Sequence, residues 1–98
     1  MIEHIVLFKF SDRTTKEQKE EGMRRLIKVK ETIPGIVDIQ AGINFSERSE
    51  GFESGLTVRF ESKEALEAYG PHPAHQEVVA YLKEVGMRDT LALDFECL

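Results

Sequence analysis

The sequence predicts an α+β fold with the element order strand, helix, strand, strand, helix, strand. Four segments alternate apolar and polar residues, which is the pattern of strands with one buried face. Between them lie segments whose apolar residues recur three and four positions apart, as in helices that cover a core. The 98 residues suffice for one hydrophobic core and not for two, so we expect a single domain over residues 1–98.

Residues 2–10 form the first predicted strand. Ile2, Val6, Phe8 and Phe10 share one face with His4, so this face is almost wholly apolar and should point toward the helices. The opposite face is mixed, as expected for a central strand whose second side is also partly covered.

The first helix begins at two overlapping capping boxes, Thr14 with Glu17 and Thr15 with Gln18, and is expected to run to about Thr32. Residues with helical spacing mark the face that it should bury against the sheet. This predicted core stripe consists of Met23, Leu26, Ile27, Lys30 and Ile33.

Two strands follow the Pro34-Gly35 pair, which stops the helix. Residues 37–45 alternate between apolar and polar, and after a charged loop residues 52–60 do the same. Because the connection between them is short, we expect these strands to pair in antiparallel fashion.

The second half of the chain contains two helical pieces and a last strand. Ser62 caps a short helix through Tyr69, and Pro73 suits the first turn of the next helix, which ends at Gly86. The predicted core face of this helix consists of His75, Val78, Val79, Leu82 and Val85. Residues 89–97 alternate again and form the fourth predicted strand.

Elements in this order make a ferredoxin-like βαββαβ fold, with a four-stranded antiparallel sheet and both helices on one face. Right-handed crossovers place the first and third strands in the centre of the sheet. The opposite face would then be bare in a monomer, and we expect a second copy of the chain to cover it. The residues assigned to this face are Ile5, Leu7, Gly55, Thr57 and Ala92.

Charge and composition exclude several classes of function. The net charge of −5 argues against nucleic acid as a partner. No apolar run is long enough to span a membrane, and the single cysteine, Cys97, favours a reducing, cytoplasmic location. The sequence has no glycine-rich phosphate loop and no setting for a nucleophilic Ser or Cys, which excludes nucleotide-dependent transfer and covalent hydrolysis.

The residues that could carry chemistry are His4, Tyr69 and His75. The predicted fold allows them to meet, since His4 points toward the helices and His75 lies on the core face of its helix. A helix N-terminus and partial burial both disfavour imidazolium, so we expect His75 to be neutral and able to accept a proton. With the Tyr69 phenol as hydrogen-bond donor, this set could remove a proton next to a carbonyl group.

Two other interpretations of these residues stay open. Histidine and tyrosine side chains in a core layer can be hydrogen-bonded structural groups without a catalytic role. His72 and His75 also have the spacing of metal ligands, but Glu77 is the only nearby carboxylate and there is no nearby cysteine, so we expect no metal and assign His72 to capping of the helix.

Several segments together resemble the stress-responsive dimeric α/β-barrel (Dabb) domain family. They are His4-Ile5-Val6-Leu7-Phe8-Lys9-Phe10, Pro34-Gly35-Ile36, Gly51-Phe52 and His72-Pro73-Ala74-His75, and the resemblance runs from end to end. It implies a homodimer whose two sheets pack face to face. The family includes plant stress proteins and a plant polyketide cyclase that closes a linear polyketide acid by aldol condensation without a cofactor.

In that cyclase two histidines and a tyrosine serve the pocket, and their motif positions correspond to His4, His75 and Tyr69. A further pocket histidine corresponds to Ser54, so the substrate of the cyclase is not carried over. Ser54, Phe8 and Val79 are expected to line the ligand cavity.

Three hypotheses of function follow. In the first, the chain is a cofactor-independent small-molecule enzyme or binding protein, with His75 as base, Tyr69 as donor and His4 orienting the ligand; it predicts an internal cavity beside these side chains. In the second, the chain is a stress-associated oligomer without catalysis, and the three side chains are packed tight. The third, a cofactor-free monooxygenase, rests on fold analogy alone.

Overall fold

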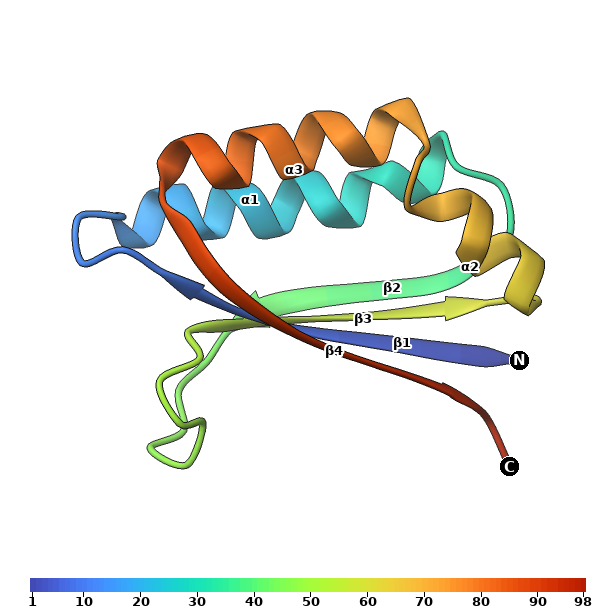
Figure 1. The fold of residues 1–98 in the computed structure, drawn as a ribbon, viewed down its shortest axis with the longest axis horizontal. Coiled ribbons are helices and arrows are strands. Elements are labelled where there is room, and N and C mark those ends of the chain that lie inside the picture. Colours follow the sequence, from blue (N-terminus) through green and yellow to red (C-terminus); the bar gives the residue numbers. More distant parts are fainter.

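The computed structural model describes residues 1–98, and its helices all lie on one face of a single antiparallel sheet (Figure 1). The elements along the chain are β1 (Ile2–Phe10), α1 (Lys16–Lys28), a 3-10 turn η1 (Val29–Glu31), β2 (Ile36–Ile43), β3 (Ser54–Phe60), α2 (Lys63–Tyr69), α3 (Pro73–Val85) and β4 (Met87–Glu96). The strand order is β2-β3-β1-β4. This confirms the ferredoxin-like fold with the first and third strands in the centre.

Helix α1 begins where the sequence predicts. Thr15 is the N-cap, and its side chain and that of Gln18 form a reciprocal capping box. The predicted core stripe is wrong at two positions, since Ile27 and Lys30 are exposed, whereas Val29 is buried. The chain tightens into η1 after Lys28, and this turn directs Val29 toward the sheet.

Gly22 allows α1 and α3 to pack closely. A Cβ atom at this position would lie 2.5 Å from Cδ2 of Leu82, a side chain that is 1% exposed. Close packing of α1 against α3 therefore explains why glycine occupies this position despite its low helix propensity. No helix of the chain has both the length and the apolar composition needed to cross a membrane.

Strand boundaries differ from the predicted ones near the loop of residues 44–53. β2 ends at Ile43 and β3 begins at Ser54, so that Phe45, predicted to lie in a strand, is 100% exposed. The last strand also begins earlier than predicted, at Met87, because it follows directly on Gly86 in a left-handed conformation. Alternation identified the strands, whereas hydrogen bonding with their neighbours decides where they end.

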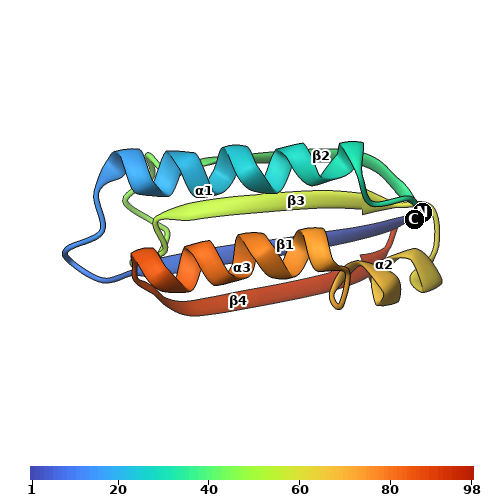
Figure 2. The same cartoon turned by 90° about the horizontal axis from the view of Figure 1, so that it is seen from above.

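The core lies between the helices and strands β1, β2 and β3. Its central members come from β1, β3, α1 and the two later helices, and they form one cluster with Phe60, Val58, Leu26, Leu82 and Tyr69 among the most buried. Seen from above, β4 runs along the edge of the sheet beyond α3 (Figure 2). All residues of β4 after Met87 are exposed, so neither face of this strand is fully covered within one chain.

The apolar row of β4 points away from the helices. Leu93 pairs with Ile5 and Leu91 pairs with Leu7, and directly paired residues share a face of the sheet. Ala92 pairs with Val6 on the helix side, so its predicted place on the bare face is wrong. Leu91 and Leu93 are 55% and 59% exposed. The bare face is therefore more apolar than the sequence analysis assumed.

Candidate functional site

The structure brings His4, Tyr69 and His75 together from three elements. His4 lies on β1, Tyr69 is the last residue of α2, and His75 lies in the first turn of α3. The ring centroid of Tyr69 is 5.9 Å from that of His4 and 4.4 Å from that of His75. The phenol ring therefore stands between the two imidazoles.

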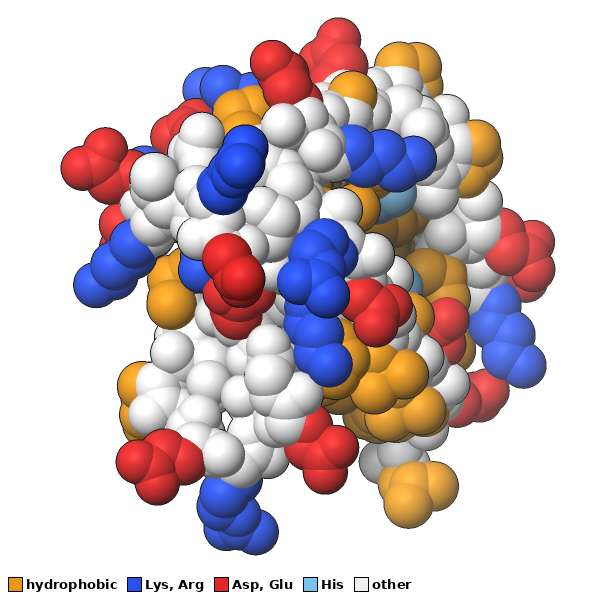
Figure 3. Space-filling model, turned by 60° about the vertical axis from the view of Figure 1, so that its left-hand side comes forward, with side chains coloured by type: hydrophobic (Ala, Val, Ile, Leu, Met, Phe, Trp, Pro, Cys, Tyr) orange, Lys and Arg blue, Asp and Glu red, His pale blue; other side chains and the backbone are white.

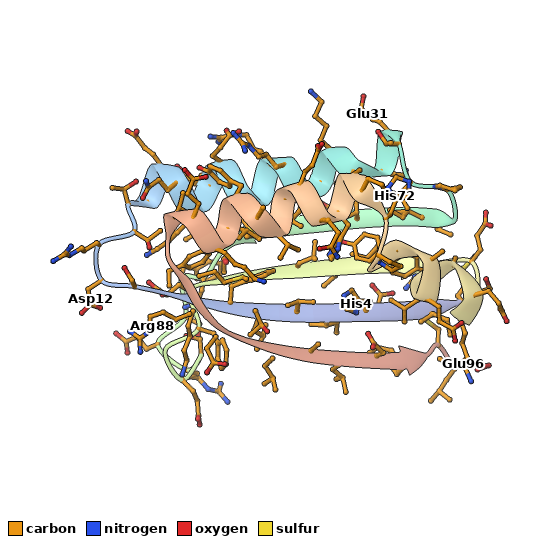
Figure 4. All side chains as sticks on the ribbon, turned by 45° about the horizontal axis from the view of Figure 1, so that its top comes forward. His4, Asp12, Glu31, His72, Arg88 and Glu96 are labelled. Carbon is orange, nitrogen blue, oxygen red and sulfur yellow. The ribbon has the colours of Figure 1, made fainter.

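The break between α2 and α3 places Tyr69 and His75 on either side of a turn. Pro73 occupies the first turn of α3, and the Nδ1 atom of His72 accepts a hydrogen bond from the backbone N–H of Ala74 at 3.0 Å. His72 is thus the N-cap of α3, as predicted from the sequence. Figure 4 shows His72 at the start of α3, at the same end of the molecule as α2.

The tautomer of His75 follows from its hydrogen bond. Its Nδ1 atom lies 2.8 Å from the carbonyl oxygen of Gly70, and a carbonyl oxygen can only accept, so Nδ1 carries the proton. Burial lowers the pKa of His75, while the bond to Gly70 opposes this shift and the nearby His4 and His72 reinforce it. In the neutral ring, Nε2 then holds a lone pair that can accept a proton.

His4 has a partner that the sequence analysis missed. Asp94 lies directly opposite His4 in the β1–β4 pairing, and its carboxylate bonds to Nδ1 of the imidazole. The carboxylate accepts a hydrogen bond from the Nδ1–H group, so Nε2 of His4 is left free for another group. Alternation along residues 89–97 could have placed Asp94 on a strand, but its pairing with His4 depends on the register of the first and last strands.

The hydroxyl group of Tyr69 is buried without a hydrogen-bond partner. The residue is 2% exposed, and its ring packs edge-on against Phe60 with a centroid distance of 5.1 Å. Burial raises the pKa of Tyr69 to about 12, so the phenol keeps its proton. An unpaired buried hydroxyl destabilises the fold by roughly 1–3 kcal/mol, so Tyr69 has a hydrogen-bond donor that the folded chain leaves unused.

Of the three residues expected to line a cavity, Phe8 and Ser54 lie away from the histidines, whereas Val79 lies near His75. Phe8 and Ser54 pair directly across β1 and β3, whereas His4 pairs with Val58, four positions along the strand and therefore about 13 Å away. Ser54 is 1% exposed and its hydroxyl also has no partner. Val79 is half-buried on α3, one turn after His75.

The internal cavity expected beside His4, Tyr69 and His75 is not among the main hollows of the structure. None of the five main surface hollows is lined by His4, Tyr69 or His75, but a groove of about 350 Å³ between α2 and β4 includes Asp94, the partner of His4. We call it the α2–β4 groove. Figure 3 shows histidine atoms in a recess among hydrophobic side chains, and the His4 side chain is 15% exposed. The His4 imidazole is therefore partly exposed, while Tyr69 stays covered.

Metal binding has no preformed site at these residues. No group of three or more His, Cys, Asp or Glu side chains is placed to hold a metal ion. The chemistry available at the site is that of two imidazoles, a phenol and a carboxylate, which can exchange protons and donate hydrogen bonds.

Comparison with known proteins gives a consistent assignment. The family described as Stress responsive A/B Barrel Domain matches residues 2–97. Olivetolic acid cyclase from Cannabis sativa is 33% identical over 76 residues, which cover 76% of this chain and 75% of the cyclase.

Solved structures agree with this match. A protein of Arabidopsis thaliana has a TM-score of 0.87 and 25% identity, with 100% of this chain and 96% of that chain covered. A protein of unknown function from a Jannaschia species, described as dimeric and ferredoxin-like, has a TM-score of 0.81 and 27% identity, with 98% of both chains covered. The chain therefore belongs to the stress-responsive A/B barrel domain (Dabb) family.

Proposed function

We propose that this protein is a cofactor-independent small-molecule enzyme of the cyclase or lyase type, acting on a carbonyl compound at His4, Tyr69 and His75. The unpaired hydroxyl of Tyr69, whose ring packs against both imidazoles, is the observation that carries the proposal. Such a donor gains a partner when a carbonyl oxygen enters the site. Similarity to a plant cyclase supports the same class of reaction.

The proposed reaction begins with removal of a proton next to the substrate carbonyl. His75 accepts this proton at Nε2, because Nδ1 already donates to Gly70. The C–H electron pair moves into the enolate, and the Tyr69 O–H donates a hydrogen bond to the oxygen that becomes negative. His4, whose Nδ1 is held by Asp94, orients the substrate through Nε2.

Ring closure then needs no catalytic group beyond these three side chains. The enolate carbon attacks a second carbonyl carbon of the same molecule, a C–C bond forms, and the new alkoxide takes the proton back from His75. The reverse sequence breaks a C–C bond, which is the lyase direction. Each step moves one proton between substrate and imidazole, and this exchange suits a neutral histidine whose pKa is lowered by burial.

A second candidate is a non-catalytic stress-associated oligomer, and the packing around Tyr69 favours it. The residue is 2% exposed, and none of the main surface hollows reaches it. In this alternative the aromatic rings of His4, Phe60, Tyr69 and His75 stabilise the core and bind no ligand. The experiment below separates the two candidates.

For either function we propose a homodimer that buries the bare sheet face. Leu91, Leu93 and Phe95 project from β4 on this side and are 43–59% exposed in one chain. Removal of these side chains from water drives association. Dimeric relatives of the same fold support the proposal.

The test of catalysis uses 2,4,6-heptanetrione, which closes by intramolecular aldol condensation to orcinol with loss of water. We expect the protein to accelerate orcinol formation above the spontaneous rate, and Tyr69→Phe and His75→Asn to reduce this acceleration by about 100-fold, the range found for acid–base groups. Asn at position 75 can still donate a hydrogen bond to Gly70, so it removes the base and keeps the local contact.

His72→Asn is the matched control, because Asn is a good N-cap and the substitution removes a histidine that caps α3. It should leave the acceleration unchanged. If the wild-type protein gives no acceleration and its His4 and His75 NMR signals do not respond to the triketone, the non-catalytic alternative holds.

A further inference from the structure

The charges around the α2–β4 groove define the class of substrate that the proposed site accepts. The groove is adjacent to the site, because Asp94 belongs to both and Ile2 precedes His4 by two positions on the same strand face. A ligand that reaches His4 from this end of the molecule passes these groups. The residues that line the α2–β4 groove are Ile2, Lys63, Leu66, Glu67, Asp94, Phe95 and Glu96.

Acidic side chains outnumber basic ones in this lining. Glu67, Asp94 and Glu96 carry negative charge, and Lys63 is the one cation, which gives a net charge of −2 from three acids and one base. The chain as a whole also carries −5. An approaching anion is therefore repelled both by the groove and by the wider field of the protein.

No cation other than Lys63 belongs to the lining of this groove. Lys19 pairs with Glu53, and Arg59 pairs with Glu3 on the opposite face of the sheet. Figure 4 shows Arg88 at the far end of β4 from Glu96. No lysine or arginine forms a hydrogen bond or salt bridge with His4, Tyr69 or His75. The site thus lacks the cation that carboxylate or phosphate recognition requires.

The inner part of the site is suited to a neutral ligand. Tyr69 keeps its proton, burial favours the neutral form of His75, and Phe60 and Leu66 supply apolar surface. Transfer of an ion into such surroundings without a paired charge is unfavourable, whether the ion is an anion or a cation. A carbonyl oxygen, in contrast, can accept the unpaired hydrogen bond of the Tyr69 hydroxyl.

We infer that the substrate is an uncharged polycarbonyl compound, and that Glu67 and Glu96 exclude its carboxylate analogues. This inference rests on the proposed function, since it names the substrate class of the same site. It assigns selectivity to two exposed residues that touch none of the proposed reacting groups.

The test compares two ligands that differ in one terminal group. In 2,4,6-heptanetrione the chain ends in an acetyl group, and in 3,5-dioxohexanoate a carboxylate takes its place. At slightly acidic pH the first is mainly neutral and the second is ionised. Dissociation constants are measured from the NMR signals of the His4 and His75 rings. We expect the triketone to bind at least about tenfold more tightly.

Variants then identify the source of the preference. In the double variant Glu67→Gln, Glu96→Gln, the difference between the ligands should shrink to about threefold or less, and added salt should reduce it in the wild-type protein. The matched control is Glu31→Gln, Glu77→Gln, which removes two charges from a different groove, between α1 and α3, and should leave the ratio unchanged.

Each outcome has a separate meaning. Equal binding of both ligands, or tighter binding of the carboxylate, overturns the assignment of substrate class and leaves the proposed site intact. An unchanged ratio in the Glu67 and Glu96 variant removes these two residues as the source of selectivity. Absence of any response of His4 and His75 to either ligand removes the proposed site itself, and the substrate class with it.

Discussion

His4 on β1 and Asp94 on β4 lie opposite each other at the edge of the sheet, and the imidazole Nδ1 bonds to the carboxylate. The residues are separated by 90 positions in the sequence, and only the pairing of the first and last strands brings them together. A carboxylate in this position fixes the tautomer and the orientation of a histidine ring. Asp94 is therefore a positioning residue for the proposed site.

Asp94→Ala removes the acceptor of the His4 Nδ1 proton. We expect the neutral ring to populate both tautomers and the acceleration of ring closure to fall by about tenfold or more. The free energy of unfolding should change by less than about 1 kcal/mol, because the Asp94 side chain is 47% exposed. Nitrogen-15 NMR of the imidazole reports the tautomer, and urea unfolding reports the stability.

Asp89→Ala is the control for this change, since Asp89 lies on the same strand opposite Lys9 and away from the site. It should leave the His4 tautomer unaltered. A His4 ring that keeps its Nδ1 proton in Asp94→Ala would show that another group holds it.

The Tyr69→Phe variant distinguishes a ligand-binding role of the Tyr69 hydroxyl from a structural role. Because the hydroxyl is buried and has no partner, its removal should stabilise the fold by about 1 kcal/mol while ring closure is lost. Thermal and urea unfolding measure the first effect, and orcinol formation measures the second. Tyr81→Phe, at a half-buried position on α3 beside Arg25, serves as the comparison. A destabilised Tyr69→Phe would mean that the hydroxyl makes a bond that contributes to folding.

His75 makes stability depend on pH in the acidic range. Burial lowers its pKa in the folded chain below the ordinary 6.5, so the unfolded chain binds the proton more readily. The stability contributed by the neutral ring is complete above pH 6.5 and is lost as the pH falls through the lower pKa of the folded state.

His75→Asn should remove this part of the pH dependence. The difference in unfolding free energy between the wild-type protein and the variant is measured by urea unfolding at about pH 7 and about pH 5. We expect the wild-type protein to lose more stability than the variant over this interval. Equal losses would place the acid sensitivity in other groups.

Local patterns in the sequence predicted most of the fold, because caps and alternation act over a few residues. The capping box at Thr15 and the N-cap at His72 follow from such short-range chemistry. The face of β4 could not be predicted in this way: the alternation of Leu91 and Leu93 indicates a buried side but not what covers it. The sequence analysis placed Ala92 on the bare face, whereas the register directs the leucines there.

The candidate site could likewise be predicted only in part from local sequence patterns. Its histidines and its tyrosine were identified from residue type and motif, and the structure places them together. Asp94 was missed because its role depends on a register set by contacts across the whole chain. The unpaired state of the Tyr69 hydroxyl depends on every neighbour of the ring, and no sequence pattern encodes it.

Gly86 is required at the junction of α3 and β4. Its φ of +118° lies in the left-handed region, and a Cβ atom would lie 2.3 Å from Oγ1 of Thr14, which itself donates a hydrogen bond to the carbonyl oxygen of Val85. Gly86→Ala should therefore destabilise the fold by at least about 1 kcal/mol in urea unfolding. Gly70→Ala is the matched control, because Gly70 has a φ of −54° and a Cβ atom there meets nothing within 4 Å. Equal stability of the two variants would contradict this account.

Leu93→Lys tests the proposed dimer. Leu93 is 59% exposed in the single chain and lies on the bare face of the edge strand β4, beside Ile5. A lysine there would place one charge from each chain in the proposed interface, and an unpaired buried charge strongly disfavours association. We expect sedimentation velocity to show a dimer for the wild-type protein and a monomer for the variant. Ile27→Lys changes an apolar side chain of α1 that is 37% exposed, and it should leave the dimer intact. A Leu93→Lys protein that stays dimeric would place the interface on another surface and leave the apolar row of β4 without an explanation.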